Sequence, residues 1–237
     1  MRSAKRVGRI IGILLLAQLI VITAGFALLV PVTTPSFLQD APANVVQIRA
    51  AVLLLTACSG ITIGVAALGF PFFRQHDHVM ALWLLALSVI WFSMQAIDNV
   101  HILSMLALSE QYARDGSPGS DLYAILGTAV RSARRFSHGT GLLAIDAWFL
   151  AFLVLLFRSS LVPRALAGFG FAMAAIHLTG VALPPFAGYG SVPVLGYALA
   201  LSYLAIVTWL VAKGFEGAHS SARIPGASQE SADVAPS

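Results

Sequence analysis

Charged side chains are scarce in this sequence: Asp, Glu, Lys and Arg together make up only 10% of its 237 residues. A typical soluble domain contains about 25% of these residues. The sequence is instead strongly apolar, with 58% hydrophobic residues and a mean hydropathy of +0.86. Short segments of alternating polarity, which a membrane β-barrel needs, are not visible. The composition therefore predicts an all-α, polytopic membrane protein.

Cysteine is nearly absent, since Cys58 is the only one. A single cysteine excludes an intrachain disulfide and a metal cluster held by several cysteines. The formal net charge of +4 does not indicate nucleic-acid binding, because the basic residues lie beside the ends of apolar runs rather than in one patch. We expect the lipid bilayer, and no nucleic acid, among the partners.

Apolar runs long enough to cross a bilayer, roughly 17–25 residues, predict six transmembrane helices. The third run is longer than a bilayer requires, so its helix should tilt or project beyond the membrane. The predicted spans cover approximately residues Gly8–Val30, Ile48–Phe73, Val79–Leu108, His138–Phe157, Arg164–Leu183 and Val192–Val211.

The remaining segments divide into connections, a surface helix and a tail. Ser109–Ser120 reads as a loop because it contains Gly116-Ser-Pro-Gly119. Asp121–Phe136 follows as a short interfacial helix before the fourth span, with arginines that would meet lipid headgroups. Residues 1–213 are thus predicted to form one six-helix transmembrane domain. Residues 214–237 are rich in Gly, Ala and Ser and are predicted to form a disordered tail.

The distribution of basic residues predicts the orientation in the membrane. With six spans, both termini lie on the same side, and Lys and Arg favour the cytoplasmic side. The side of the termini collects Arg2, Lys5, Arg6, Arg9, Arg74, Arg158, Arg164, Lys213 and Arg223. The opposite side has only Arg49, Arg114, Arg131, Arg134 and Arg135. We expect a multi-pass protein of the inner (plasma) membrane with both termini in the cytoplasm.

Four ionisable residues interrupt the apolar runs: Asp98, His101, Asp146 and His177. An ionisable group at membrane depth costs several kcal/mol, which makes such residues functional candidates. At 1.5 Å per residue, all four lie roughly 9–15 Å below the outer boundary of the membrane. Their common depth on three spans predicts an outward-facing polar pocket.

This pocket suggests distinct roles for its members. Asp98 and Asp146 are candidates for acid–base catalysis, because burial in apolar surroundings favours the proton-bound carboxyl. His101 and His177 are candidate ligands of a metal ion, with zinc as the possible cofactor. Other polar residues at comparable depth or at the pocket mouth are candidates for ligand binding: Gln95, Asn99, His138, Thr56, Ser59 and Tyr203.

Several functions fit this pattern. The residues can bind a small apolar or lipid-like molecule or a partner protein, or they can simply join helices by hydrogen bonds. An intramembrane enzyme, either a metal-dependent hydrolase or an acid–base isomerase or cyclase, is the alternative, although no compact motif such as His-Glu-x-x-His supports it. A proton-coupled transporter would need a homodimer to supply its missing half. Haem ligation would rest on two histidines alone.

Short motifs in the later half connect the sequence to a known family. They are His138-Gly139, Arg158-Ser-Ser-Leu-Val-Pro163-Arg164 and Gly168-Phe-Gly170, together with Arg9-Ile-Ile-Gly12 near the start. With these motifs the chain resembles a bacterial six-span membrane family of unknown function, domain of unknown function 4386. The resemblance implies the six-span topology and brings no established activity.

Overall fold

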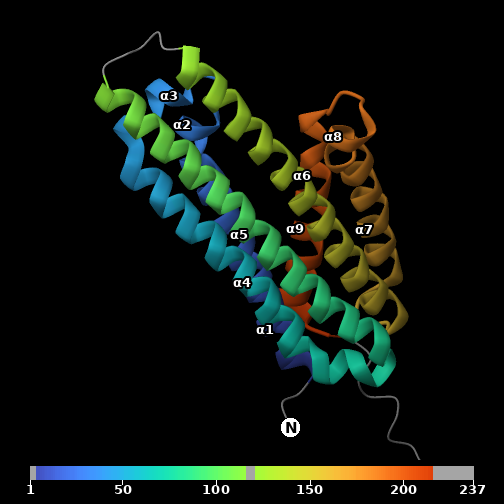
Figure 1. Ribbon diagram of the computed structural model, residues 1–237. Coiled ribbons are helices and arrows are strands. Elements are labelled where there is room, and N and C mark those ends of the chain that lie inside the picture. Colours follow the sequence, from blue (N-terminus) through green and yellow to red (C-terminus); the bar gives the residue numbers. More distant parts are fainter. Residues whose placement is uncertain (1–3, 116–120, 216–237) are drawn as a thin grey trace, which may run out of the picture.

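Six long helices dominate the computed structural model, which describes residues 4–115 and 121–215 (Figure 1). Each is long and apolar enough to cross a membrane, the fifth only together with the helical turn that follows it, over Arg164–Ala182. The described residues contain no strand, so the predicted all-α, six-span architecture is confirmed. The long helices are α1 (Ala4–Leu28), α4 (Val45–His76), α5 (His78–Asp115), α6 (Asp121–Arg158), α7 (Arg164–His177) and α9 (Gly196–Lys213).

Short helical turns form the connections at the end of the molecule opposite the N-terminus (Figure 1). Most of them begin at or next to a proline, whose fixed φ suits the first turn of a helix. They are α2 (Val30–Thr33), α3 (Phe37–Asp40), η1 (Pro42–Asn44), α8 (Pro184–Ala187) and η3 (Pro193–Leu195). The π-helical turn η2 (Leu178–Ala182) extends α7 up to α8.

The separate interfacial helix predicted over Asp121–Phe136 is not confirmed. These residues are instead the first turns of α6, which continues without a break to Arg158. No proline interrupts residues 121–158, and the helix therefore runs on from the surface into the span. Likewise, the first part of the predicted loop completes α5 as far as Asp115, while residues 116–120 lie outside the described residues.

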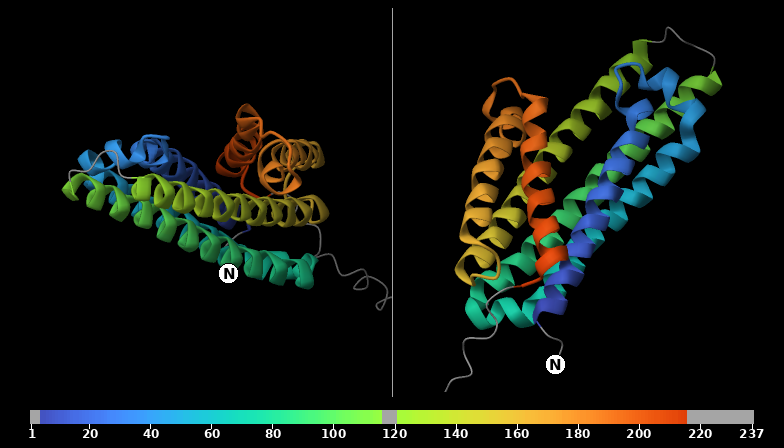
Figure 2. Two further views of the ribbon diagram at one scale, coloured as in Figure 1. Left: turned by 45° about the horizontal axis from the view of Figure 1, so that its top comes forward. Right: turned by 180° about the vertical axis from the view of Figure 1, so that it is seen from behind.

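The helices form two parts of unequal length. In one, α4 packs against α1 and α5, and α5 packs against α6; in the other, α7 packs against α9. At 1.5 Å per residue, the 38 residues of α6 extend about 57 Å, whereas the 18 of α9 extend about 27 Å. The two parts meet near the N-terminus and diverge toward the other end (Figure 2).

Close contact between α1 and the end of α9 brings the two described ends of the chain together. A Cβ added to Gly8 would lie 2.3 Å from the backbone nitrogen of Phe215, so no larger residue fits there. Arg9 also donates a hydrogen bond to the carbonyl oxygen of Ala212 (3.1 Å). The first residues of the predicted tail, Gly214 and Phe215, are thus packed, while the tail beyond them lies outside the described residues.

Apolar packing occurs in two clusters, and polar side chains lie between them along α5. Ala81 and Leu84 belong to the cluster nearer the termini, which centres on the aromatic side chains of α6. Ile102 and Met105 belong to the cluster at the opposite end. The intervening turns of α5 bury several polar side chains, among them Gln95, Asp98 and Asn99.

Asp77 fixes the tight connection between α4 and α5. Its carboxylate accepts a hydrogen bond from the backbone N–H of Met80 (3.0 Å), as an N-capping residue does, and another from Arg158 at the end of α6 (2.5 Å). The Met80 N–H and the nearby Arg158 guanidinium hold the pKa of Asp77 below its usual range.

Replacing Asp77 should lower the melting temperature of the protein in detergent micelles by a few degrees. At pH 7 we expect Asp77→Ala to lower it more than Asp77→Asn, because Asn keeps the cap and loses only the ion pair. The pKa in the folded state lies below the unfolded value of about 3.9. The stabilisation by the carboxylate is therefore present above that value and is lost as the pH falls through the folded-state pKa. A difference between wild type and Asp77→Asn that persists unchanged at pH 3 would contradict this role.

Candidate functional site

Asp98 is the centre of a polar cluster that joins α5 to α6. The side chain is almost fully buried, and its Oδ1 accepts a hydrogen bond from the hydroxyl of Ser137 (3.1 Å). Its Oδ2 lies 3.4 Å from Nδ1 of His138 and 3.7 Å from Nη2 of Arg134. His101, one turn along α5, places its Nδ1 3.0 Å from Ser137 Oγ. Two of the predicted histidines thus belong to the same cluster as Asp98.

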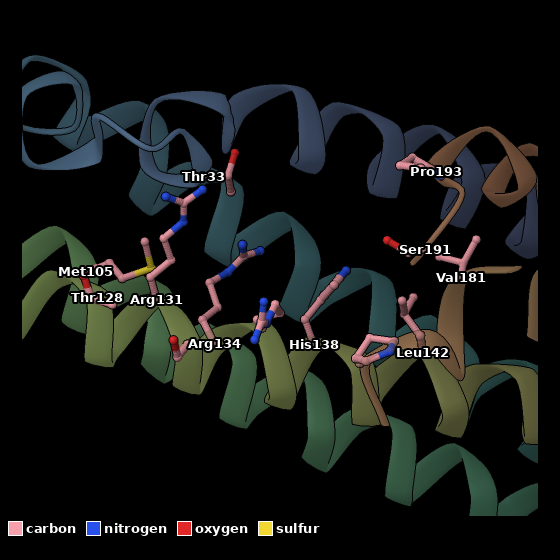
Figure 3. Close-up of a pocket in the computed structure, with 14 residues that line it drawn as sticks. Thr33, Met105, Thr128, Arg131, Arg134, His138, Leu142, Val181, Ser191 and Pro193 are labelled. Atoms are coloured by element: carbon pink, nitrogen blue, oxygen red, sulfur yellow. The ribbon is translucent and has the colours of Figure 1, made fainter. Parts of the chain in front are cut away.

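A cavity of about 520 Å³ lies beside this cluster, between the two parts of the bundle. Its volume is within the range of small-molecule pockets, roughly 300–1,000 Å³. Figure 3 shows Arg131, Arg134 and His138 rising from α6 into a space with Thr33 on one side and Ser191 on the other. The lining residues are Thr33, Met105, Thr128, Arg131, Ser132, Arg134, Arg135, His138, Gly139, Leu142, Val181, Pro185, Ser191 and Pro193.

α6 supplies eight of these 14 residues, and the part of its surface that they form is strongly basic. Residues three and four apart lie side by side on a helix, which brings Arg131, Arg134, Arg135 and His138 into one group. Asp98 pairs with Arg134. Among the described residues, Arg131 and Arg135 have no ion pair with a carboxylate. The cavity wall therefore carries more positive than negative charge.

The guanidinium of Arg134 has an unused donor. Its side chain is 14% exposed, and its buried Nε has no hydrogen-bond partner among the described residues. A buried N–H without an acceptor is costly, and in native proteins such a group is normally paired with protein, water or ligand. Oδ2 of Asp98, the carboxylate oxygen 3.7 Å from Nη2 of Arg134, is likewise without a hydrogen-bond partner among the described residues.

The cavity lies at the end of the α6 span that is remote from Arg158. About twenty helical residues cross the hydrocarbon core of a bilayer. Counted back from Arg158, where α6 ends near the termini, these residues reach His138. Arg135, Arg134 and Arg131 then lie roughly 5–10 Å beyond the core, at the depth of lipid headgroups.

Asp146 and His177 form a pair of their own, away from the basic wall. Nδ1 of His177 lies 2.8 Å from Asp146 Oδ1 and 2.9 Å from Oδ2, and both side chains are buried. The pair joins α6 to the end of α7, where the π-helical turn begins. Neither residue lines the cavity.

A further group joins α5 to α4. Gln95 donates to the side-chain oxygen of Asn99 (3.0 Å), and Asn99 donates to the hydroxyl of Thr56 (2.9 Å). Ser59 donates to the carbonyl oxygen of Thr56, as hydroxyls in membrane helices often do. These four predicted ligand-binding residues contact one another across the two helices, and none of them lines the cavity.

Tyr203 belongs to a buried network between α1, α4 and α9. Its hydroxyl donates to Oε1 of Gln18 (2.8 Å), and Nε2 of Gln18 donates to Thr62 (2.9 Å). The network lies within the apolar packing and away from the cavity lining. Gln18 is absent from the residues expected from the sequence; a lone amide in the first apolar run was the available signal.

The predicted metal ligands occupy different groups. His101 contacts Ser137, whereas His177 contacts Asp146. In residues 4–115 and 121–215, no group of three or more His, Cys, Asp or Glu side chains is arranged to hold a metal ion. Of the residues predicted to form the pocket, His138 lines the cavity, and Asp98 and His101 lie behind it. The arginines of its wall were predicted to contact headgroups, but not to belong to the pocket.

Comparison with known proteins agrees with the helical architecture. Residues 10–214 match the family described as a domain of unknown function, DUF4386. The chain belongs to this family. No curated protein and no solved structure matches the chain. Membership in DUF4386 confirms the resemblance inferred from the short motifs and adds no activity.

The pairing of Asp146 with His177 should be measurable as an energetic coupling. Asp146→Leu and His177→Leu should each cost about 1–3 kcal/mol, because each leaves a buried polar partner unsatisfied. The double replacement should cost less than the sum of the two. Melting of the four proteins in detergent micelles tests this prediction. Asp146→Leu combined with Asp77→Asn, which share no partner, is the control and should be additive; additivity for Asp146 and His177 would contradict the pairing.

Proposed function

We propose that this DUF4386 protein binds a lipid-like molecule in the cavity between the two parts of its helix bundle. The observation that carries the proposal is the mixed lining of the cavity. Met105, Leu142 and Val181 offer apolar contacts, while the arginine-bearing face of α6 offers hydrogen-bond donors. A pocket that is apolar with a few convergent polar groups is typical of ligand-binding sites.

The position of the cavity supports the same proposal. Its lining residues belong to the end of the bundle opposite the described chain ends, Ala4 and Phe215, where the two parts of the bundle diverge (Figure 2). With the termini in the cytoplasm, as the basic residues predict, the cavity faces the outer leaflet. An amphiphile could then enter directly from the bilayer.

Filling the cavity should remove the bound molecule. Leu142→Trp places a larger side chain in the apolar part of the lining. We expect several-fold less co-purified lipid than in wild type, measured by mass spectrometry of solvent extracts from protein purified in mild detergent. Leu103→Trp on α5, where the side chain is 40% exposed, is the control and should retain the lipid. Equal lipid content in both variants would reject the cavity as the binding site.

Acid–base chemistry on a lipophilic substrate is a second candidate function. It is favoured by one contact: Nδ1 of His138 lies 3.4 Å from the buried carboxylate of Asp98, while His138 itself lines the cavity. A carboxylate beside one ring nitrogen orients an imidazole, and the other nitrogen can then exchange a proton with a bound molecule.

Turnover distinguishes this second function from binding alone. Purified protein would be incubated with a bacterial lipid extract, and new lipid species would be followed by mass spectrometry. If the pair is catalytic, His138→Gln should lower the rate of product formation by about 100-fold or more, as for loss of a general base, and Asp98→Asn should lower it less, because Asp98 only orients the imidazole. His76→Gln, in the turn at the opposite end, is the control. Absence of any product with wild type would leave binding as the function.

A further inference from the structure

We propose that the cavity recognises a phosphate group carried on an apolar chain, with Arg131 and Arg135 as its main ligands. This inference deepens the proposed function and rests on it. It concerns the chemical class of the ligand, which the presence of a cavity alone does not fix.

The first reason is the charge of the wall. Arg131 and Arg135 are exposed to the cavity and have no ion pair with a carboxylate among the described residues. Arg135 instead has its guanidinium 5.3 Å from the centre of the Phe136 ring. Two positive charges without counter-charges beside an apolar cavity favour an anion of one or two negative charges. A phosphate group carries such a charge.

The second reason is the arrangement of the donors. Arg131, Arg134 and Arg135 are neighbours on α6 and all line the cavity, so three guanidinium groups belong to one wall. Guanidinium groups match the oxygens of phosphate with pairs of parallel hydrogen bonds. Ser132 and Ser191 add hydroxyl groups to the lining.

Asp98 forms an ion pair with only one of the three arginines on the cavity wall. It lies behind α6 and contacts Arg134 and His138 from the side of α5. The carboxylate therefore offsets one of the three guanidinium charges. The charges of Arg131 and Arg135 remain available to a ligand. Asp98 is in this sense a positioning residue, since it holds Arg134 on the wall.

The third reason is the change in polarity along α6. Arg131 lies at headgroup depth, whereas Leu142 lies eleven residues, or about 16 Å, further toward the membrane centre. Val181 of the π-helical turn lies opposite this apolar end of the cavity. A molecule with a phosphate at one end and an acyl chain at the other fits that gradient. A water-soluble phosphate compound would leave the apolar part of the lining unused.

Binding of matched lipids to the purified full chain tests the inference. The probes are phosphatidic acid, diacylglycerol with the same acyl chains, and inorganic phosphate alone. Their affinities would be measured in detergent by native mass spectrometry and by shifts in melting temperature. We expect phosphatidic acid to bind most tightly, diacylglycerol at least about tenfold more weakly, and phosphate alone weakly, because charge-assisted hydrogen bonds and the chain each contribute.

Variants of the wall identify the residues responsible. Arg131→Gln and Arg135→Gln should each weaken binding of phosphatidic acid about tenfold and leave diacylglycerol unaffected. Arg131→Lys, which keeps the charge but loses the paired hydrogen bonds, should be intermediate and serves as the conservative variant if a Gln variant does not fold. Arg49→Gln is the matched control, because Arg49 lies at the same end of the molecule and outside the cavity, where it pairs with Glu110.

The outcomes separate this inference from the proposed function. Equal binding of phosphatidic acid and diacylglycerol, unchanged in the arginine variants, would overturn phosphate recognition and leave lipid binding standing. Binding of neither lipid would overturn both. Inorganic phosphate binding as tightly as phosphatidic acid would identify a site for free phosphate and overturn the part played by the chain. An equal loss of affinity in Arg49→Gln would show a general surface attraction and overturn the assignment to the cavity wall.

Discussion

The buried carboxylate of Asp98 is the constraint on which the half of the bundle around the cavity depends. A buried charged group is tolerated only with partners, and the partners of Asp98, which are Ser137, His138 and Arg134, all lie on α6. These contacts fix the rotation of α6 about its axis relative to α5. That rotation turns the arginine-bearing face toward the cavity rather than toward the surrounding lipid.

The position of the cavity follows from the unequal lengths of the helices. The longer α5 and α6 extend past α7 and α9, and the short helices end in the proline-rich turns around α8. Gly139 lets these turns approach α6, since a Cβ there would lie 3.2 Å from the ring of Phe186. The cavity is therefore bordered by short turns on one side and by α6 on the other. The arginines of α6 reduce the excess of Lys and Arg on the side of the termini, from which the orientation in the membrane is predicted. Binding of a phosphate group would explain why these arginines lie on the opposite side.

Most other polar residues in the spans contact one another rather than the cavity. Asp146 with His177, Asn99 with Thr56, and Tyr203 with Gln18 each join two helices. Lipid tails are as apolar as the helices themselves, so hydrogen bonds and close packing hold such a bundle together. These residues thus support the framework around the cavity, and the basic face of α6 carries the chemistry that distinguishes the proposed ligand.

The sequence by itself determined the six spans, because bilayer thickness sets the length of an apolar run, and prolines such as Pro184 mark where a run ends. It also placed Asp98 and Gln95 in a polar layer, which lies between two apolar clusters. It did not reveal that Asp121–Phe136 continues into α6, nor which polar residues contact each other. Pairs such as Asp98 with Ser137 and Asp146 with His177 depend on how each helix is rotated and tilted against its neighbours. The position of a residue along its helix can be counted from the sequence. The neighbouring helix toward which its side chain points is decided by packing between helices, and only the tertiary structure shows it.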